Sequence, residues 1–350
     1  MYRSFLSHHV HAPLHCFPSL TRCTATLSST CITHNRHGSA ALPWVSLVQF
    51  NFVQLCKIVM LLEALQRGCL PFLVDNRQVG LIRPDFWTHF KNYPDVFNLH
   101  EKSDGTKKYG VHLNEDCKNY KERTNAVNKV LEDLRAKDAV GALRGWRDEN
   151  YSVKSNYTME PLLEVERAAS GLFGFLQYGV HINGFTRSPN GEMKMWIGRR
   201  SKTKQTFPDM FDNMCAGGLP AGMGIMDCAR KECQEEASVS DKLLDRLKPV
   251  GCISYFYEDE RGLQPESQYV FDLELPEDFT PVNADGEMGS FQLLTMNEMQ
   301  AEIVGGNFKP NCAAICLDFL IRHGFFDFDS DPNIMFYIEQ MHAPLQSMYK

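Results

Sequence analysis

Residues 217–239 read GGLPAGMGIMDCARKECQEEASV, and this stretch decides how the sequence around it is interpreted. It begins with a glycine-rich run, which allows tight turning and close approach of the backbone. Asp227 then lies near the start of a segment with helical character, where a carboxylate interacts favourably with the positive end of the helix dipole. Glu232, Glu235 and Glu236 follow at i, i+3 and i+4, a spacing that places three carboxylates on one helical face. The stretch therefore predicts a glycine-rich turn that leads into a helix with one acidic face.

Three neighbouring carboxylates on one helical face indicate a cation site. Like charges at this spacing destabilise a helix by roughly a few tenths of a kcal/mol per pair, and a bound divalent cation removes that repulsion. Carboxylate oxygens are the ligands that Mg²⁺ and Mn²⁺ prefer, and Mg²⁺ keeps several waters while it binds substrate phosphates. The alternative is an acidic face that is simply solvated, which is common on helices. The glycines upstream favour a metal–diphosphate site.

The same stretch resembles the Nudix box, the signature Gly-x5-Glu-x7-Arg-Glu-U-x-Glu-Glu-x-Gly-U, in which U is aliphatic. Gly217 and Val239 match its first and last positions. Glu232, Glu235 and Glu236 match its three helix carboxylates. The resemblance implies the Nudix α/β/α sandwich, with a mixed sheet between helices, and a hydrolase that uses Mg²⁺ or Mn²⁺ to cleave a diphosphate bond.

Three of the glycine, glutamate and arginine positions depart from that signature. Met223 stands where the first glutamate belongs, Lys231 replaces the arginine, and Ser238 replaces the last glycine. Lys231 keeps the positive charge without the bidentate fork of arginine, and Ser238 gives up the easy left-handed conformation of glycine after a helix. Met223 and Lys231 favour an alternative function, a catalytically silent ligand-binding or regulatory module with the same fold.

The resemblance extends beyond the box, over roughly residues 61–342, and is carried by residues 171–185, 196–222 and 308–325. These segments resemble one Nudix subgroup, often labelled thiamin pyrophosphokinase-like, that has an extra N-terminal domain. The subgroup implies hydrolysis of thiamin diphosphate or its oxidised analogues, with release of a monophosphate. A kinase would need an ATP site, and no Gly-x4-Gly-Lys-Ser/Thr phosphate loop occurs in this sequence.

The resemblance also implies roles for individual carboxylates. Glu235 and Glu236 are expected to be the primary metal ligands, and Glu232 to be a ligand or to position the base. A further carboxylate of this fold often comes from a later loop, where Asp285 and Glu287 are the candidates and Glu287 is preferred. The alternative for Glu287 is an exposed turn residue, because Asp-Gly sequences are typical of turns.

Basic residues follow an apolar, strand-like run ahead of the glycine-rich turn. They are Arg199, Arg200, Lys202 and Lys204. Arg199 and Arg200 are expected to hold phosphate oxygens, together with the backbone at Gly217 and Gly218. A solvated basic surface is the alternative for the whole cluster.

Length and composition limit the class of protein. A chain of 350 residues with 43% hydrophobic and 23% charged residues is typical of a soluble globular protein with two domains. Its net charge of −7 argues against a nucleic-acid binder, so a small-molecule diphosphate is the expected partner, and a homodimer is compatible with the sequence. The 12 cysteines form no Cys-x-x-Cys pair, which favours free buried thiols over structural zinc.

The first 60 residues differ from the rest. No acidic residue precedes Glu63, while arginine, serine and histidine are frequent. This composition predicts a transit peptide for mitochondria or another organelle; the alternative is a meaningless leader upstream of a start at Met60 in a cytoplasmic protein. Residues 39–56 carry no charge, but Pro43 and Gln49 argue against a membrane-spanning helix, and no membrane association is expected.

Periodicity and turn residues predict the local structure. We expect a strand–turn–strand over residues 72–82, a helix from Pro84, and a helix capped by Thr124. Residues 148–157 are polar and turn-like, a short helix is expected over 161–174, and two paired strands over 179–196. Pro310 should open a helix that Gly324 closes.

These elements suggest a division into three parts. Residues 1–60 would be a leader, residues 61–165 a smaller α+β N-terminal domain, and residues 166–350 the Nudix domain. The N-terminal domain carries no residue constellation that predicts chemistry.

Overall fold

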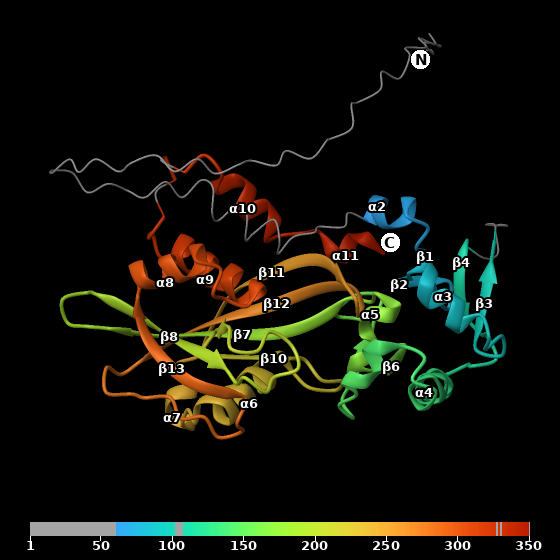
Figure 1. Ribbon diagram of the computed structural model, residues 1–350, viewed down its shortest axis with the longest axis horizontal. Helices are drawn as coiled ribbons and strands as arrows, with labels where there is room; N and C mark the ends of the chain where they lie inside the picture. The colour runs from blue at the N-terminus through green and yellow to red at the C-terminus, as the bar shows by residue number, and fades with distance from the viewer. Residues whose placement is uncertain (1–60, 102–107, 327, 330, 350) are drawn as a thin grey trace, which may run out of the picture. The chain divides into compact units, whose positions relative to one another are not determined.

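The computed structural model describes residues 61–101, 108–326, 328, 329 and 331–349 (Figure 1). The leader over residues 1–60 and the uncharged segment 39–56 lie outside this part of the chain. Among the described residues, every helix is too short or too polar to span a bilayer. The cysteines in this part are free thiols, most of them buried, in agreement with the prediction of free thiols.

The first folded part is built on a four-stranded sheet in the order β2-β1-β4-β3. Its strands are β1 (Leu70–Val74), β2 (Arg77–Ile82), β3 (Phe97–His100) and β4 (Gly110–Leu113). The predicted strand–turn–strand is confirmed: Asp75 and Asn76 both have positive φ, 49° and 58°, which matches the two-residue turns that favour hairpins. Strands β1 and β4 pair in parallel.

Helices cover this sheet and enclose an aromatic core. They are α3 (Pro84–Phe90) and α4 (Tyr120–Ala136), followed by the 3₁₀ turn η1 (Gly141–Gly145). Helix α2 (Leu61–Gln66) packs instead, through Ala64, in a separate cluster with Leu81 and Phe256. The rings of Phe90 and Phe173 stack with centroids 4.8 Å apart, and Phe72 lies 5.1 Å from Phe173. Because this core combines apolar residues before 145 with Phe173, the chain as far as residue 173 packs with the first sheet.

The prediction that Thr124 caps the long helix was wrong. Helix α4 begins one turn earlier, where the side chain of Asn119 accepts a hydrogen bond from the backbone of Glu122, as an N-cap does. Thr124 lies inside the helix and its hydroxyl accepts a hydrogen bond from the backbone of Glu164 at 3.0 Å. The Thr124 hydroxyl is thus used in a contact with a residue far along the chain.

The region 148–174 also differs from its prediction. Instead of a polar turn and a helix, it forms the hairpin of β5 (Asn150–Val153) and β6 (Leu163–Glu166). Tyr151, Val153, Leu163 and Val165 are buried at alternate positions, which is the period of a strand. Only then follow the 3₁₀ turn η2 (Arg167–Ala169) and α5 (Ser170–Phe173), which ends at the left-handed Gly174 as expected.

The second folded part is a seven-stranded mixed sheet. The order is β11-β12-β7-β8-β13, with β10 beside β7 and β9 beside β8. Its strands are β7 (Gln177–Arg187), β8 (Met193–Arg200), β9 (Phe211–Asp212), β10 (Cys215–Gly218), β11 (Lys248–Asp259), β12 (Gly262–Leu275) and β13 (Met288–Thr295). The predicted strand pair over residues 179–196 is confirmed by β7 and β8, and β12 runs parallel to β7.

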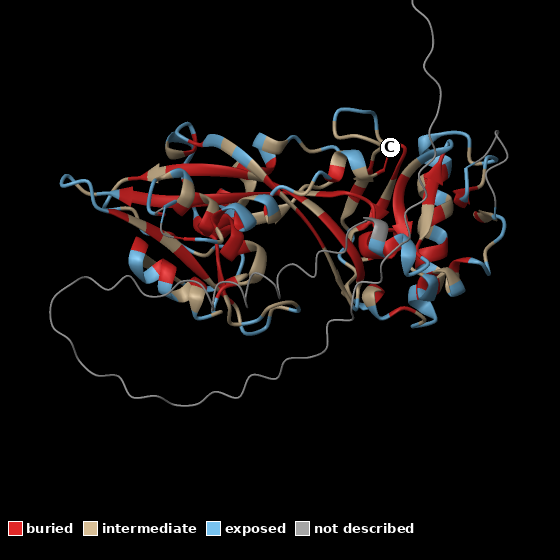
Figure 2. Ribbon diagram, turned by 90° about the horizontal axis from the view of Figure 1, so that it is seen from above, coloured by how far each residue is buried: buried red, intermediate tan, exposed pale blue. Residues whose placement is uncertain are grey.

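Helices pack on both faces of this sheet and complete the expected α/β/α sandwich. Helix α6 (Ile225–Ala237), followed by α7 (Asp241–Leu244), shares a core with strand residues such as Val180 and Phe271. Helices α8 (Met296–Val304), α9 (Pro310–Arg322) and α10 (Ile334–Gln340) pack with Met195 and Ile253; α11 (Leu345–Met348) follows. Buried strands therefore lie between half-exposed helices (Figure 2), and the predicted helix from Pro310 is confirmed.

Candidate active site

Two adjacent glycines position the loop between β10 and α6. A Cβ added to Gly217 would lie 2.2 Å from the carboxyl carbon of Glu232, and a Cβ added to Gly218 would lie 1.7 Å from the hydroxyl oxygen of Tyr151. Neither distance is compatible with a side chain. Gly217 therefore lets a helix carboxylate approach the strand, and Gly218 lets a residue of the β5–β6 hairpin approach it. Gly222 has φ 79° and makes the turn into the helix.

Helix α6 carries the acidic residues as predicted, and its C-terminus explains one departure from the signature. Ser238 adopts the left-handed conformation, φ 53° and ψ 37°, that a glycine usually takes at this place. Its hydroxyl donates a hydrogen bond to the carbonyl of Val282 at 2.8 Å. The serine thus keeps the helix end in its usual geometry and ties it to the loop before β13.

Glu236 is the buried carboxylate of the helix. Its residue exposure is 3%, and the side chain accepts a hydrogen bond from the backbone of Ala216 at 2.8 Å. Burial, followed by the negative charge of Asp212, raises the pKa of Glu236 well above its usual value. A nearby cation would lower this pKa and favour the ionised form of Glu236.

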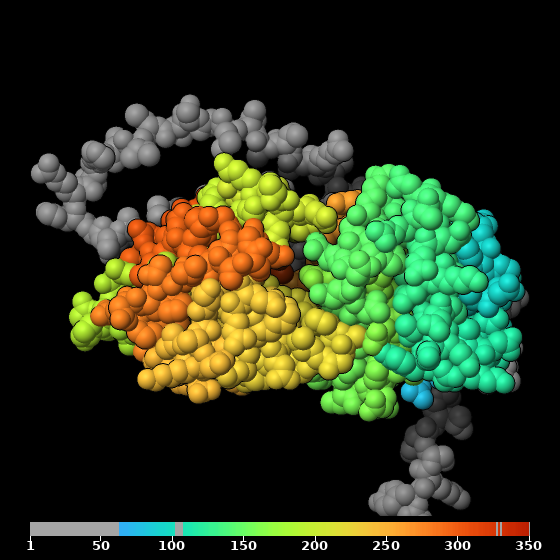
Figure 3. Space-filling model, turned by 90° about the horizontal axis from the view of Figure 1, so that it is seen from below, coloured from blue at the N-terminus to red at the C-terminus, as the bar shows by residue number. Residues whose placement is uncertain are grey.

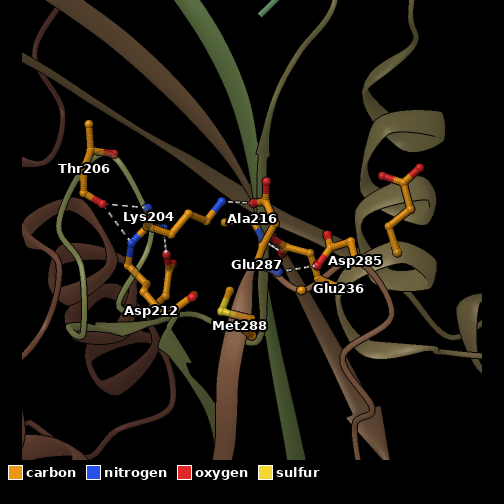
Figure 4. Close-up of polar contacts among 12 residues, drawn as sticks. Lys204, Thr206, Asp212, Ala216, Glu236, Asp285, Glu287 and Met288 are labelled. Atoms are coloured by element: carbon orange, nitrogen blue, oxygen red, sulfur yellow. Dashed lines mark hydrogen bonds and ion pairs between the residues drawn. The ribbon is translucent and has the colours of Figure 1, made fainter. Parts of the chain in front are cut away.

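Two carboxylates of the loop before β13 converge on Glu236. Oxygen atoms of Glu236, Asp285 and Glu287 all lie within 4.8 Å of one another, and Figure 4 shows the three side chains gathered at one place. The loop is held there because Asp285 accepts a hydrogen bond from the backbone of Glu287 at 2.8 Å and Ala284 donates one to the carbonyl of Glu235 at 3.3 Å. Carboxylate oxygens at this spacing fit a hard divalent cation.

Lys204 lies beside this group and forms an ion pair with Glu287 (Figure 4). Burial alone would raise the pKa of Glu287, but the hydrogen bond and charge of Lys204, with the charges of Arg147 and Arg167, lower it. Within one site, burial therefore raises the pKa of Glu236, whereas at Glu287 the hydrogen bond and charges of nearby cations outweigh burial and lower the pKa.

The structure does not bring Glu232 and Glu235 into that group. Lys231 lies between them, 3.3 Å from Glu232 and 2.7 Å from Glu235. The Glu232 side chain is 13% exposed, and burial raises its pKa. Glu235 is half-exposed. Lys231 thus neutralises two of the three carboxylates expected to bind metal.

Arg199 and Arg200 have acidic partners of their own. Arg199 donates to Asp209 at 2.7 Å. Arg200 is buried and donates to Asp212 at 2.7 Å and to the carbonyl of Thr206 at 2.9 Å. Both arginines hold the loop between β8 and β9, whose Lys204 contacts the converging carboxylates.

Sequence reasoning missed two residues of the β5–β6 hairpin and its flank. Tyr151 is 5% exposed, and the guanidinium of Arg167 lies 5.5 Å from the centre of its ring. Arg167 pairs with Glu149 at 3.0 Å, and its charge also acts on Glu232 and Glu287. The surface is hollowed where the green, yellow-green and orange segments meet (Figure 3). Nothing in the local sequence places this hairpin beside the acidic helix.

Comparison with known families gives two adjacent matches. Residues 178–312 match the model described as the NUDIX domain. Residues 50–177 match a domain of unknown function, DUF4743.

Comparison with curated proteins gives relatives in plants and yeast. Nudix hydrolase 20, chloroplastic, of Arabidopsis thaliana is 38% identical over 260 residues, which cover 73% of this chain and 68% of the relative. Nudix hydrolase 24, chloroplastic, of the same plant is 37% identical over 259 residues, with the same coverage. An uncharacterized protein of Saccharomyces cerevisiae is 37% identical over 236 residues, 64% of this chain and 68% of that protein.

Proposed function

The chain belongs to the Nudix hydrolases that carry a DUF4743 domain before the Nudix domain, and from this premise we propose that it hydrolyses a small organic diphosphate to a monophosphate with Mg²⁺ or Mn²⁺. The observation that carries the proposal is the convergence of Glu236, Asp285 and Glu287 within 4.8 Å. Glu236 is buried there with a raised pKa. A divalent cation would balance these charges.

The fit of the donor set to a hard cation supports this assignment. Three carboxylates from α6 and from the loop before β13 supply only oxygen ligands, which is the set that Mg²⁺ and Mn²⁺ prefer. Glu236 and Glu287 would hold the metal directly, with Asp285 as the third ligand. We keep Glu232 and Glu235 as proposed ligands, with Lys231 moving from them when metal and substrate bind.

Each group has a part in the reaction. The bound metal would neutralise the diphosphate and activate a water. Lys204 and Arg167 provide positive charge beside the carboxylates and would contact phosphate oxygens. Arg199 and Arg200 would act on the diphosphate through the loop that they hold. Gly217 and Gly218 would act by letting Glu232 and Tyr151 lie close to the strand.

The group attached to the diphosphate is proposed from the subgroup that the sequence resembles. Residues 171–185, 196–222 and 308–325 carry that resemblance, and it favours thiamin diphosphate or its oxidised analogues. A Nudix box contacts the diphosphate and the metal, so it does not by itself choose the remainder of the substrate.

The test is a panel of diphosphates with and without Mg²⁺ or Mn²⁺. The panel contains thiamin diphosphate, its oxo and oxy analogues, ADP-ribose and nucleotide sugars, and the released monophosphate is measured. The double variant Glu235→Gln, Glu236→Gln should lose metal-dependent release. Glu132→Gln, an exposed change on α4, is the matched control and should keep it.

A catalytically silent binding module is the second candidate. Met223 in place of the signature glutamate and the pairing of Lys231 with Glu232 and Glu235 favour it. Folded protein that binds metal and releases no monophosphate from any member of the panel would establish this alternative.

We also propose targeting to an organelle. Residues 1–62 contain no aspartate or glutamate, which is typical of transit peptides, and two relatives are named chloroplastic. A fluorescent fusion of the full chain should reach an organelle, and a fusion that begins at Met60 should stay in the cytoplasm. Equal distribution of the two fusions would contradict targeting.

A further inference from the structure

We propose that the β5–β6 hairpin and the loop before α6 together form a pocket for a planar aromatic group attached to the diphosphate. The inference rests on the proposed hydrolase function and adds the place where the rest of the substrate binds. It assigns a role in substrate choice to residues of the DUF4743 region.

A cavity lies between these two segments. Its volume is about 400 Å³, within the range of small-molecule sites. The wall combines polar side chains with an aromatic and apolar part, whose main members are Tyr151, Tyr157, Tyr178, Leu219, Pro220 and Met223. The charged groups in the wall are Lys154 and Glu160, which have opposite signs. A cavity that binds phosphate would need a basic wall. This cavity therefore suits the organic part of the substrate and not its phosphates.

The tyrosines of the wall support one another. The rings of Tyr157 and Tyr178 meet edge to face, with centroids 4.9 Å apart and planes at 66°, and Tyr157 lies 5.5 Å from Tyr269. Gln346 donates a hydrogen bond to the Tyr178 hydroxyl at 2.8 Å. Rings that are held in place before binding present an aromatic surface at a low cost in conformational entropy.

The pocket shares the loop before α6 and the side chain of Tyr151 with the surroundings of the acidic helix. Ala221 of the loop donates a backbone hydrogen bond to Asn150 of the hairpin at 2.8 Å, and Tyr151 contributes to the pocket wall while its hydroxyl touches Gly218. The guanidinium of Arg167 lies over the Tyr151 ring, and its positive charge interacts with Glu232. In this proposal one substrate extends from the tyrosines, past the Tyr151 side chain, toward the carboxylates.

This arrangement explains the departure at Met223. The signature has glutamate at this position, and here the side chain lines the pocket and packs with the apolar core under α6. A carboxylate would bring an additional negative charge into a wall of tyrosines, whereas a thioether makes favourable contacts with aromatic rings. The substitution therefore fits a pocket that holds an organic ring.

The main test compares ring-bearing and aliphatic diphosphates. Thiamin diphosphate and ADP-ribose are the ring-bearing substrates, and isopentenyl diphosphate is the aliphatic one. Tyr157→Ala should raise KM for the ring-bearing substrates about three- to tenfold, with kcat and the kinetics of isopentenyl diphosphate unchanged. Tyr157→Phe keeps the ring and should restore the wild-type KM. Phe336→Ala, an exposed aromatic on α10 outside the pocket, is the control.

A second measurement separates this inference from the proposed function. Binding of unphosphorylated thiamin is measured by calorimetry for wild type and Tyr157→Ala, without any hydrolysis. Thiamin binding that weakens in Tyr157→Ala while wild type hydrolyses no diphosphate would support the pocket and reject the hydrolase proposal. Hydrolysis of ring-bearing substrates with an unchanged KM in Tyr157→Ala, and thiamin binding unchanged as well, would reject the pocket alone.

Discussion

Two groups of three metal-ligand side chains occur among the described residues, and they differ in charge balance. Glu236, Asp285 and Glu287 form the first, and His181, Asp212 and Cys312 form the second. The second group is buried throughout, whereas the first ranges from buried to exposed. Similar spacing between ligand atoms therefore occurs in two different environments.

The second group is satisfied by the protein itself. Asp212 accepts hydrogen bonds from Arg200 and from the Cys312 thiol, both at 2.7 Å, and the His181 ring hydrogen-bonds the Asn213 side chain at 2.8 Å. Burial would raise the pKa of Asp212, but the charges of Lys309 and Arg200 lower it to about 2.

The first group lacks such compensation, because Lys204 pairs with Glu287 while Glu236 keeps a raised pKa. The two groups have similar spacing between their ligand atoms. What distinguishes them is that, among the described residues, Glu236 has a negative charge without a direct cationic partner, whereas Asp212 is already paired within the protein. Four experiments can break or sharpen this comparison.

The largest expected effect is on stability in the structural network. Asp212→Asn leaves the buried Arg200 without its counter-charge and should lower the free energy of unfolding by about 3–5 kcal/mol, measured by urea denaturation. Asp209→Asn removes the exposed partner of Arg199 and should change the free energy of unfolding far less, because water already screens this pair. Equal losses in the two variants would show that the Asp212 network is not structural.

The next effect is on catalysis. Glu236→Gln keeps the oxygen that accepts from the Ala216 backbone and removes the negative charge. It should lower kcat/KM by more than about 100-fold, because mutating even a residue that only hydrogen-bonds a metal ligand lowers activity about 10- to 100-fold. In EDTA the same variant should melt at a higher temperature than wild type, since a buried charge is gone. A variant that loses activity and also melts earlier would contradict the assignment.

Metal binding should stabilise the folded protein only through the group of Glu236, Asp285 and Glu287. Mn²⁺ at about ten times its Kd should raise the free energy of unfolding of wild type by about 1.4 kcal/mol, measured by thermal shift. Glu236→Gln should lose this increment and His181→Gln should keep it. The reverse pattern would move the metal site to the second group.

The smallest effect is the pH dependence of metal-free stability, and its sign differs between the groups. Glu236 has a pKa raised above its usual value of 4.5 by burial, so its contribution to stability falls as pH rises from about 4.5 through the raised pKa. Asp212 has a pKa lowered from 3.8 to about 2, so its contribution is present above 3.8 and is lost as pH falls toward 2.

Burial, followed by the charge of Lys309, lowers the pKa of His181 from 6.5 to about 4. The stability that His181 contributes is complete above 6.5 and decreases as pH falls through that interval. Urea denaturation at a series of pH values above 4.5 should show, in wild type, a decrease in the free energy of unfolding that Glu236→Gln removes. A wild-type profile identical to that of the variant would contradict the raised pKa.

The sequence predicted those features that depend on short-range spacing. The acidic face of α6, the hairpin of β7 and β8 and the helix from Pro310 follow from periodicity and turn residues, and the structure has each of them. Glu287 was selected as the later carboxylate, and the structure places it beside Glu236; its role as a ligand stays a prediction. Lys204 was noticed only as one member of a basic cluster.

The features that the sequence did not predict depend on contacts between distant segments. Tyr151 and Arg167 come from a region that was interpreted as turn and helix, and they approach the site only because the hairpin packs against Gly218. Likewise, Asn119 caps the helix, and Thr124 instead accepts a hydrogen bond from the backbone of Glu164, which lies 40 residues further along the chain. Periodicity carries no information on such pairings.

The contact of Tyr151 with Gly218 affects where the chain can be cut to express the Nudix domain alone. An expression fragment that begins at residue 178, where the match to the NUDIX domain begins, would lack the phenol ring that fills the space over Gly218 and the Asn150 carbonyl that accepts from Ala221. Such a fragment would expose apolar surface beside its reaction centre and be prone to aggregate. Domain exchange between homologues should therefore keep the hairpin and the loop from the same parent.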